Sequence, residues 1–565
     1  MLAETPPQTT VAALARAAQR FGEREAVVDG DVRMDFETLR TEVHDVARAL
    51  IALDVPARAR VAVWAPNTHH WMLFALAVHC AGGTLVPVNT RFTGHEALDV
   101  LARTRADVLA VPDRFLGADR VEQLRTAAAT DQSDVDGGAD RPVPGLPDLR
   151  HVVLLPGDGS GPAPEPGPGI LPWAELMSHT ITVTRQRLEQ RSARVGPDDI
   201  SDILFTSGTT GRSKGAMSTH RQAMAVADAW AECGELDHTD RYLVINPFFH
   251  SFGYKAGMLA ALSRGATVIP QPTFDISQAM TLIHRERVTV LPGPPTIYQS
   301  MLDAPDRSEV DTSSLRLAVT GAAMVPMALV ERMRRDLTFD TVLTAYGLTE
   351  AVVVTMCRPG DAPDTISRTS GRATAGFEIR IVDRDGRVLG PGENGEVLLR
   401  GPNVMQGYLD DPDATAEAVD DAGWLHTGDV GNLDERGYLT LTDRLKDVYT
   451  CGGFNVYPAE VEQTLAQLDG VVESAVVGVP DERLGEVGRA FVVVRDGAAT
   501  TDDDIVAFCA ERLANYKRPR YVDLVPDLPR NAGGKVLKRE LRQRTAAQPV
   551  SATAGVHPPS DKESR

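Results

Sequence analysis

The chain has 565 residues, 43% of them hydrophobic, and a formal net charge of −20. Its length exceeds the size at which one hydrophobic core keeps growing, so two or more domains are expected. The acidic balance argues against a nucleic-acid partner, because such recognition depends on lysine and arginine meeting phosphates.

The five cysteines are dispersed and form no Cys-x-x-Cys pair, which excludes a disulfide framework and a zinc site. The first seven residues have neither a basic nor an apolar region, so no signal peptide is expected. Residues 71–88 are the most apolar stretch, but His79, Gly82 and Gly83 interrupt it. This pattern is typical of a buried helix leading into a strand rather than a membrane span. We therefore expect a cytoplasmic protein with no integral membrane segment.

As far as residue 445, short apolar runs alternate with helical patterns. Such alternation predicts βαβ units in an α/β fold, here a large N-terminal domain over residues 1–445. The expected strands are residues 60–64, 84–88, 107–111, 151–155 and 203–205, with an amphipathic helix over residues 71–80. Polar tracts rich in Gly, Pro and Asp, such as residues 157–169, predict an insertion with little to bury.

Near residues 443–446 the pattern changes, which predicts a second, small α+β domain over residues 446–545. We expect a helix entered at Pro458, a strand over residues 474–479 and a helix over residues 503–513. Residues 546–565 look like a disordered tail.

Residues 205–216 (FTSGTTGRSKGA) are the most informative segment. Glycines let backbone N–H groups turn inward, hydroxyls add short donors, and Lys214 brings a mobile charge. Together they predict a loop that wraps phosphate; a flexible surface loop is the alternative. A Walker loop is excluded, because Ser213 stands where that motif has glycine. The phosphate-contacting residues would be Thr206, Ser207, Gly208, Thr209, Thr210, Gly211 and Lys214.

This segment closely resembles the phosphate loop of the adenylate-forming superfamily, which includes acyl-CoA synthetases, luciferases and peptide-synthetase adenylation domains. The resemblance implies a large N-terminal domain, a small mobile C-terminal domain, and ATP, Mg²⁺ and CoA as ligands. Further segments match the superfamily in its order, from residue 205 to about residue 540. Ser213 departs from the usual proline, which changes loop stiffness rather than donors.

Residues 346–350 (YGLTE) match the nucleotide motif of the family. Adenine needs a flat apolar partner, phosphate a hydroxyl donor, and Mg²⁺ a hard oxygen ligand. Tyr346, Thr349 and Glu350 supply these, with Gly347 between them and with Thr206 as a second oxygen for the metal. The resemblance makes Gly321, Ala322 and Ala323 the small-residue turn that the base approaches.

Residues 424–429 (WLHTGD) resemble another family motif. A carboxylate accepts both ribose hydroxyls, so Asp429 is the expected ribose ligand, assisted by Arg444. A buried Asp–Arg pair that joins two domains is the structural alternative.

In the C-terminal part the resemblance makes Lys446 the hinge, and Gly452 and Gly453 the close approach for the pantetheine arm of CoA. Residues 529–535 (PRNAGGK) resemble the catalytic loop, in which Lys535 stabilises the anionic transition state of adenylation. Cys451 is unusual for this loop and is interpreted as a spectator. Between residues 511 and 544, ten Lys or Arg face four Asp or Glu, which indicates either chance clustering or a cationic face.

Residues 246–253 (NPFFHSFG) resemble the aromatic–histidine motif beside the acyl pocket, with His250 lining or gating it and Phe249 as an apolar wall. Nearby Lys255 is either a solvated surface lysine or a donor to a substrate carbonyl. The pocket would also include residues 352–354 (VVV), which favour a compact, bulky acyl group.

The implied function is an ATP-dependent acyl-CoA ligase that forms AMP and pyrophosphate through an acyl-adenylate. Residues 61–71, 87–92 and 246–257 also resemble the actinobacterial ligases of steroid breakdown, which activate a methyl-hexahydroindanedione propanoate. Medium- or long-chain fatty acids and other cyclic propanoates remain as substrates, and a carrier protein remains as acceptor. A P-loop kinase, which would release ADP, and a non-catalytic nucleotide sensor are the other classes. The oligomeric state stays open.

Overall fold

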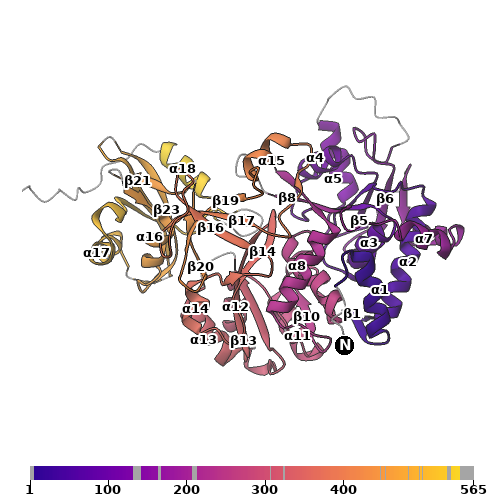
Figure 1. Cartoon of the computed structure of the whole chain (residues 1–565), viewed down its shortest axis with the longest axis horizontal. Helices are drawn as coiled ribbons and strands as arrows, with labels where there is room; N and C mark the ends of the chain where they lie inside the picture. The colour runs from indigo at the N-terminus through magenta and orange to yellow at the C-terminus, as the bar shows by residue number, and fades with distance from the viewer. Residues whose placement is uncertain are drawn as a thin grey trace, which may run out of the picture. The chain divides into compact units, whose positions relative to one another are not determined.

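The computed structural model describes residues 6–130, 141–162, 164, 167–206, 213–305, 307–321, 325–445, 447–451, 454–481, 483–495, 497–498, 500–530 and 536–547. The chain divides into two compact units. The larger takes in the chain up to Arg380 together with Leu398–Thr427 and Leu433–Thr440, and the smaller takes in Ile381–Val397, Gly428–Asn432 and the chain from Leu441 onward. Each is a mixture of helices and strands, so the predicted α/β class is confirmed (Figure 1).

The largest sheet of the larger unit has eight strands in the order β18-β9-β8-β4-β3-β5-β6-β7. Strands β4, β3, β5, β6 and β7 pair in parallel, as the predicted βαβ units require. The strands are β3 (Arg60–Val63), β4 (Thr84–Pro87), β5 (Val108–Pro112), β6 (His151–Leu155), β7 (Ile170–Pro172), β8 (Ile200–Thr206), β9 (Lys214–Thr219) and β18 (Gly407–Tyr408). All five strands predicted from the sequence lie here.

Helices cover both faces of this sheet (Figure 1). Successive side chains of a strand point to opposite faces. Val61 and Val63 accordingly join the core with α2 and α3, whereas Ala62 and Trp64 join the core with α4 and α5. These helices are α2 (Phe36–Ala52), α3 (His69–Cys80), α4 (Gly94–Thr104) and α5 (Arg120–Thr130).

Helix α3 differs from its prediction in one respect. It forms where expected, but every residue from Trp71 to Cys80 is buried, so it is not amphipathic. A helix with apolar residues all round is buried on all sides, and here α2 and the sheet enclose it. Among the described residues, no helix is both long and apolar enough to cross a bilayer.

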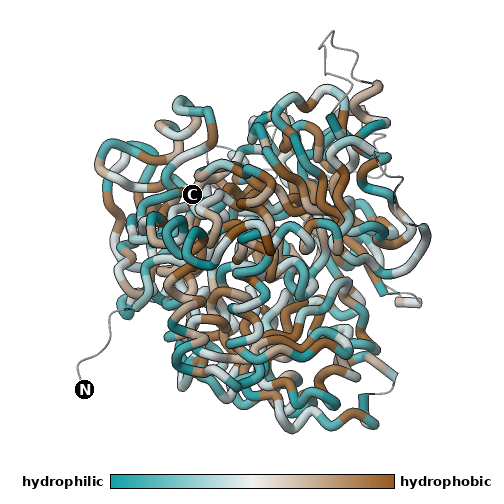
Figure 2. Tube along the Cα trace, turned by 90° about the vertical axis from the view of Figure 1, so that its right-hand side faces the viewer, coloured by the Kyte–Doolittle hydropathy of each residue, from teal (hydrophilic) through white to brown (hydrophobic). Residues whose placement is uncertain are grey.

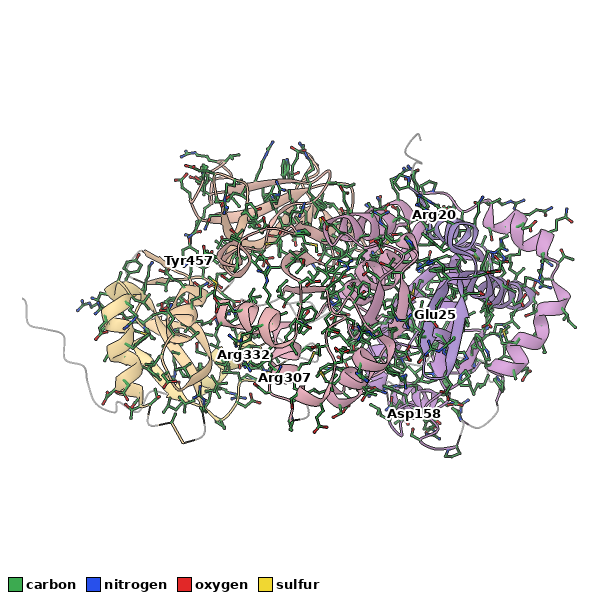
Figure 3. The ribbon with its side chains drawn as sticks, turned by 90° about the horizontal axis from the view of Figure 1, so that it is seen from below. Arg20, Glu25, Asp158, Arg307, Arg332 and Tyr457 are labelled. Atoms are coloured by element: carbon green, nitrogen blue, oxygen red, sulfur yellow. The ribbon has the colours of Figure 1, made fainter. Side chains whose placement is uncertain are left out.

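Two further sheets lie wholly within the larger unit. Each has four strands, in the orders β10-β11-β1-β2 and β12-β13-β14-β15. Val290 bridges in parallel to Tyr242 of β10 and to Leu317 of β12, which connects the two sheets. The Glu25 carboxylate accepts from Arg241 at 2.6 Å and from Arg33 at 2.8 Å, joining β1, β2 and β10. Figure 3 labels Glu25 among the side chains of the larger unit. The strands are β1 (Glu25–Asp29), β2 (Val32–Asp35), β10 (Arg241–Val244), β11 (Thr267–Pro270), β12 (Leu317–Gly321), β13 (Thr341–Leu348), β14 (Ala351–Met356) and β15 (Arg372–Ala373).

The remaining helices of the larger unit pack around these sheets, and side-chain caps set several of their starts. Thr9 accepts from the Ala12 N–H, and Thr219 and Gln222 form a reciprocal capping box. The helices are α1 (Thr10–Phe21), α6 (Trp173–Ser178), α7 (Arg185–Ser192), α8 (His220–Cys233), α9 (Ser251–Gly253), the π-helix η2 (Tyr254–Leu259), α10 (Ala260–Arg264), α11 (Ile276–Glu286), α12 (Pro295–Leu302), α13 (Met327–Asp336), α14 (Pro363–Arg368) and α15 (Pro412–Ala418). Hydrophobic stretches of the trace gather along the packed strands, and hydrophilic stretches lie toward the periphery (Figure 2).

A further sheet has the order β16-β17-β19-β20, and the division into two units runs through its strands. The smaller unit has its own five-stranded sheet, β22-β21-β24-β23 with β25 beside β24, and its own core. The helices predicted at Pro458 and at residues 503–513 and the strand at residues 474–479 are present. The elements are β16 (Glu378–Val382), β17 (Gly395–Arg400), β19 (Leu425–Leu433), β20 (Leu439–Arg444), β21 (Tyr449–Cys451), β22 (Phe454–Val456), α16 (Pro458–Leu465), β23 (Val471–Asp481), β24 (Gly485–Val494), α17 (Asp502–Arg512), β25 (Tyr521–Leu524) and α18 (Lys538–Ala547).

Two predicted irregular segments fall partly outside the described residues. Residues 157–162 are exposed, as expected of an insertion with little to bury. This segment is nevertheless held by hydrogen bonds to residues 116 and 117: Asp158 accepts from Leu116 N at 2.7 Å, and Ser160 accepts from Gly117 N at 2.9 Å. Of the predicted tail, residues 546–547 end α18 and the rest lies outside the description.

Candidate active site

Strands β8 and β9 form an antiparallel hairpin around the predicted phosphate loop. Thr206 pairs with Lys214 in the register, and its Oγ donates to the Lys214 carbonyl at 3.3 Å. Ser207, Gly208, Thr209, Thr210 and Gly211 lie outside the described residues. The structure therefore places both ends of the loop side by side, with one hydroxyl and one ammonium at its base.

Arg103 braces the returning end of this loop. Its guanidinium donates to the Ser213 carbonyl at 2.7 Å and lies 5.1 Å from the centre of the Phe205 ring. A cavity of about 510 Å³ opens here, lined by Arg103, Arg105, Ser213, Lys214 and Asp410 among others. Cationic side chains around the loop suit a phosphorylated ligand. Sequence reasoning missed Arg103, because it comes from α4, more than 100 residues upstream.

Tyr408 connects the loop lysine with the predicted metal carboxylate. Lys214 Nζ lies 4.9 Å from the centre of the Tyr408 ring, and the Tyr408 hydroxyl donates to Glu350 Oε1 at 2.8 Å. Burial and the neighbouring Glu350 charge raise the pKa of Tyr408, which keeps the hydroxyl protonated as a donor. No sequence pattern singled out Tyr408; only the pairing of β18 with β9 brings it here.

The predicted nucleotide motif begins at the end of β13. Tyr346 is half-buried and pairs with Thr355 of β14, and the register shifts between Tyr346 and Leu348. Thr349 and Glu350 occupy the turn to β14, and both are partly accessible. The structure thus places Tyr346, Gly347, Thr349 and Glu350 in one strand end and turn.

Two glycines in this region tolerate no side chain. A Cβ on Gly321 would lie 2.4 Å from the Ala345 carbonyl, and one on Gly347 would lie 2.5 Å from Val353 N. Gly321 ends β12 beside β13, as the predicted close turn requires. Ala322 and Ala323 lie outside the described residues.

Val353, in the predicted acyl pocket, has a left-handed backbone with φ of 58°. A β-branched residue rarely adopts this conformation, which persists only when its surroundings hold it. Thr374 Oγ donates to the Val353 carbonyl at 2.9 Å, and Asn403 Nδ2 donates to the Val352 carbonyl. Backbone strain therefore lies in β14, three residues after Glu350.

Asn67 fixes the turn that precedes His250. Its amide donates to the Val244 and Asn246 carbonyls at 3.1 and 2.9 Å, and its Oδ1 accepts from Phe248 N at 2.7 Å. Asn67 is 3% exposed, and the hydrogen bonds of its side-chain amide are made to the backbone of this turn. The residue lies in the 61–71 segment of the sequence, where its role was not foreseen.

His250 caps the short helix α9. Its Nδ1 accepts from Phe252 N at 3.2 Å, which leaves the proton of the neutral ring on Nε2. The side chain of His250 is exposed. Phe249 is half-buried beside it, and Phe248 is fully buried against Trp71.

Lys255 is not a solvated surface lysine, so that interpretation was wrong. It lies in the π-helix with 1% exposure, and its Nζ is 2.8 Å from Asp202 Oδ1 and donates to Ser218 Oγ at 2.8 Å. The positive charge of Lys255 is therefore neutralised by a buried carboxylate. The apolar sequence around it hid this pairing, because Asp202 lies on β8 and Ser218 on β9.

The predicted ribose ligands lie on neighbouring strands, in segments that belong to the smaller unit. Asp429 is on β19 and 4% exposed, and Arg444 is the last residue of β20. The Leu445 N–H donates to the Gly428 carbonyl at 2.8 Å, which brings the two strand ends together. The side chain of Arg444 lies outside the description, as do Lys446, Gly452, Gly453 and Lys535.

Other features of the smaller unit bear on its predicted chemistry. Burial raises the pKa of Cys451, which is 2% exposed, and this suits a spectator. The basic surplus after residue 511 is largely neutralised by ion pairs: Lys517 with Glu460, Lys538 with Glu462, Arg530 with Glu473 and Arg542 with Asp447. The alternative of a strongly cationic face is therefore not favoured. All five cysteines are free and buried, and the described residues contain no group of metal-ligating His, Cys, Asp or Glu.

The comparisons with known proteins agree with this arrangement. The AMP-binding enzyme family matches residues 14–409, and the AMP-binding enzyme C-terminal domain matches residues 460–535. The 7a-methyl-1,5-dioxo-octahydro-1H-inden-4-yl propanoyl:CoA ligase of Rhodococcus jostii (strain RHA1) is 56% identical over 537 residues, 95% of this chain and 99% of the relative. The ligase of the same name from Mycobacterium tuberculosis is 52% identical over the same shares of the two chains.

Solved structures of the same fold include ATP-bound MatB from Rhodopseudomonas palustris, with a TM-score of 0.81 and 28% identity over 94% of this chain and 98% of that one. An anthranilate CoA ligase in complex with anthranoyl-AMP has a TM-score of 0.81 and 27% identity over 96% and 98%. Such neighbours have a large N-terminal and a small C-terminal domain, so the predicted fold is confirmed. The chain belongs to the AMP-binding enzyme family and is an AMP-forming acyl-CoA ligase.

Proposed function

We propose that this ligase activates the propanoate side chain of a 7a-methyl-1,5-dioxo-octahydroindene. The observation that carries the proposal is the near full-length similarity, above 50% identity, to two ligases named for that acyl group. The medium-chain acyl-CoA ligase of Homo sapiens and the feruloyl-CoA synthase of an Amycolatopsis species are 33% and 35% identical, which makes linear and aryl acids the weaker alternatives.

In the first half-reaction, a carboxylate oxygen attacks the α-phosphorus of ATP and pyrophosphate leaves. We assign the β- and γ-phosphates to the loop over residues 206–211 with Lys214, and the adenine to Tyr346 beside Gly321, Ala322, Ala323 and Gly347. Thr349 would donate to phosphate, and Asp429 with Arg444 would hold the ribose. Lys535 would stabilise the charge that builds on the α-phosphate.

Mg²⁺ fits the donor set on this site. Glu350 offers a partly accessible carboxylate fixed by the Tyr408 hydroxyl, and Thr206 offers a hydroxyl at the loop base. Hard oxygen ligands of this kind are those that Mg²⁺ prefers. When bound, the ion would neutralise phosphate charge; Glu350 and Thr206 would hold it.

In the second half-reaction, the CoA thiol attacks the acyl-adenylate and AMP leaves. We propose domains over residues 1–445 and 446–545, with residues 546–565 as a tail. The smaller domain would turn at Lys446, withdraw Lys535 and present Gly452 and Gly453 to the pantetheine arm. His250 and Phe249 would line the acyl pocket. Five free cysteines support a reducing, cytoplasmic setting.

A pyrophosphate-release screen tests the substrate. The indanedione propanoate, C6–C16 fatty acids and aryl propanoates are compared with MgATP and CoA, and the thioester and AMP are identified by mass spectrometry. We expect the indanedione acid to have the highest kcat/KM by at least tenfold. A fatty acid that matches or exceeds it would refute the substrate. In a parallel assay with a phosphopantetheinylated carrier protein in place of CoA, thioester formation on the carrier alone would refute CoA as acceptor.

A further inference from the structure

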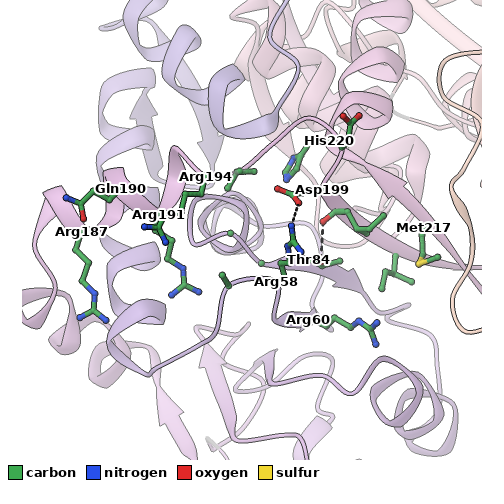
Figure 4. A pocket seen from close by; sticks show the side chains of 17 residues that line it. Arg58, Arg60, Thr84, Arg187, Gln190, Arg191, Arg194, Asp199, Met217 and His220 are labelled. Carbon is green, nitrogen blue, oxygen red and sulfur yellow. Dashed lines mark hydrogen bonds and ion pairs between the residues drawn. The ribbon is translucent and has the colours of Figure 1, made fainter.

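The larger unit contains a second cavity, of about 770 Å³, which the proposed chemistry does not use. Its lining includes the first residues of three strands: Arg60 of β3, Thr84 of β4 and Ile200 of β8 (Figure 4). The phosphate loop follows the last residue of β8, Thr206. At about 3.3 Å per residue, these two ends of β8 are roughly 20 Å apart. The cavity therefore lies near the N-terminal end of β8, and the phosphate loop follows the C-terminal end of the same strand.

Positive charge is concentrated in this cavity. Five arginines and two aspartates line it, a surplus of three positive charges in a chain whose net charge is −20. Burial holds the pKa of His220 at about 2, so that ring stays neutral. The arginines are Arg58, Arg60, Arg187, Arg191 and Arg194.

Helix α7 and the turn after it supply three of these arginines. Within α7, Arg187, Gln190 and Arg191 follow the spacing i, i+3 and i+4, which places them on one face. Arg194 lies in the turn after the helix and also lines the cavity. Figure 4 shows Arg187, Gln190 and Arg191 together on this side of the cavity. Arg187 and Arg191 are like charges one turn apart, an arrangement that destabilises a helix on its own. Arg185 belongs to the same helix but does not line the cavity.

The arginines differ in how they are held. Arg191 donates to the Ala81 and Val55 carbonyls, both at 2.6 Å, and Arg60 donates to the Thr104 carbonyl at 3.0 Å. Neutral carbonyls fix these side chains without cancelling their charge. Desolvation and the neighbouring Arg187 lower the pKa of Arg191, as unneutralised like charges would.

Two arginines remain available to a ligand. Within the described ranges, the guanidinium groups of Arg187 and Arg194 make no hydrogen bond or ion pair, and both side chains are exposed. Arg58 pairs with Asp199 at 3.1 Å, but its side chain is 83% exposed. The cavity therefore combines anchored and free guanidinium groups in a volume typical of small-molecule sites.

We propose that this cavity is a binding site for a multiply charged phosphate-bearing anion, separate from the catalytic phosphate loop. Guanidinium groups present paired donors that match phosphate oxygens, and several of them converge here without acidic partners. Val195, Ile203 and Met217 form an apolar part of the lining. These side chains would contact the organic part of a phosphate ester, whereas an inorganic polyphosphate would need the guanidinium groups alone.

The experiment is a calorimetric titration of the full-length protein with inorganic tripolyphosphate and, separately, with fructose 1,6-bisphosphate. Four proteins are compared: wild type, Arg187→Ala/Arg194→Ala, the matched control Arg185→Ala, and Lys214→Ala. We expect saturable wild-type binding that weakens with added salt. The double variant should bind at least tenfold more weakly at this cavity, as expected when charged hydrogen bonds are removed, and Arg185→Ala should bind as wild type does. Lys214→Ala should lose any binding at the phosphate loop and keep the binding that depends on Arg187 and Arg194.

Binding of tripolyphosphate alone would identify an inorganic ligand, and binding of the sugar bisphosphate would identify a phosphate ester. Absence of saturable binding to wild type would overturn the proposal. So would a loss in Lys214→Ala without a loss in the double variant, since the anion would then occupy the catalytic loop. An equal loss in Arg185→Ala would reduce the effect to general surface charge. Thermal melts of all four proteins exclude unfolding as the cause.

Discussion

Lys255 and Asp202 form an ion pair of 2.8 Å between side chains that are 1% and 0% exposed. Asp202 lies on β8 and also accepts from Ser201 Oγ at 2.6 Å, while Lys255 donates to Ser218 on β9. The pair thus joins both strands of the phosphate-loop hairpin to the π-helix that follows His250. Single π-helical turns often occur at functional sites, and this one carries a charge into the core.

We expect Lys255→Met to lower the free energy of unfolding by about 3–5 kcal/mol, because it leaves the Asp202 carboxylate buried without a counter-charge. Adding Asp202→Asn should restore much of the loss, since no buried charge then remains. Urea unfolding measures both variants.

The matched control is Arg335→Met. Arg335 pairs with Asp336 at 2.9 Å, but its side chain is 68% exposed, so its loss should cost less than about 1 kcal/mol. If Lys255→Met cost no more than this control, or if the double variant were less stable than Lys255→Met, the buried pair would not be the connection described.

Tyr408→Phe removes one hydroxyl and keeps the ring beside Lys214. We expect adenylation, measured as pyrophosphate release, to fall about tenfold to a hundredfold, because Glu350 loses a charge-assisted hydrogen bond of 2.8 Å. Tyr438→Phe is the matched control. The Tyr438 hydroxyl also donates to a carboxylate, that of Asp361, at a distance of 2.7 Å, but this pair is not part of the phosphate-loop region. Equal losses in the two variants would argue against a positioning role for Tyr408.

How much of this site the sequence predicts depends on the distance over which a pattern acts. The loop from Thr206 to Lys214 and the turn from Tyr346 to Glu350 are local, so residue type and spacing were sufficient to propose them as site segments. Tyr408, Arg103 and Asn67 act through pairing with distant segments, which no local pattern records. Lys255 was misjudged for the same reason: its partner Asp202 is 53 positions away, within an apolar strand.

The stability of the protein should fall as the pH is lowered from 6.5 toward 4. Burial lowers the pKa of His79 to about 4, and that ring is fully buried with its Nε2 3.0 Å from the Ser201 carbonyl. Between pH 6.5 and 4, His79 binds a proton in the unfolded state but stays neutral in the folded state. The contribution of His79 to the free energy of unfolding is therefore complete above pH 6.5 and is lost progressively below it. The size for His79 is about 3 kcal/mol.

Burial is the cause of the lowered pKa of His79, and the hydrogen bonds of the ring are ones that a neutral imidazole can make. Thr10 Oγ lies 2.9 Å from His79 Nδ1 and 3.0 Å from His220 Nδ1, and a hydroxyl has only one proton to give. A consistent chain runs from His220 Nδ1–H to Thr10, from the Thr10 hydroxyl to His79 Nδ1, and from His79 Nε2–H to Ser201. A proton added to His79 would break it.

His79→Gln should make the pH dependence of stability between 6.5 and 4 shallower by the share of one histidine, because glutamine offers similar donors and acceptors without titrating. His220 and His70, whose pKa values burial also lowers, keep their own shares. Urea unfolding at pH 7, 6 and 5 gives the slope. His284→Gln, at an exposed position of α11, should keep the wild-type slope. An unchanged slope in His79→Gln would assign the acid sensitivity to other groups.

Gly253→Ala should disturb the turn that presents His250. A Cβ at this position would lie 2.3 Å from both the Asn246 and the Pro247 carbonyl oxygens, and backbone atoms cannot swing aside as a flexible side chain can. We expect a loss of about 3 kcal/mol in the free energy of unfolding, as for overpacking in a rigid site, together with a higher KM for the acid. At Gly196 the nearest atom to an added Cβ is 3.6 Å away, so Gly196→Ala should leave both quantities unchanged. A Gly253→Ala protein with wild-type stability and wild-type KM would mean that this turn yields readily, and the acyl pocket would then not depend on the packing of Asn67, Asn246 and His250.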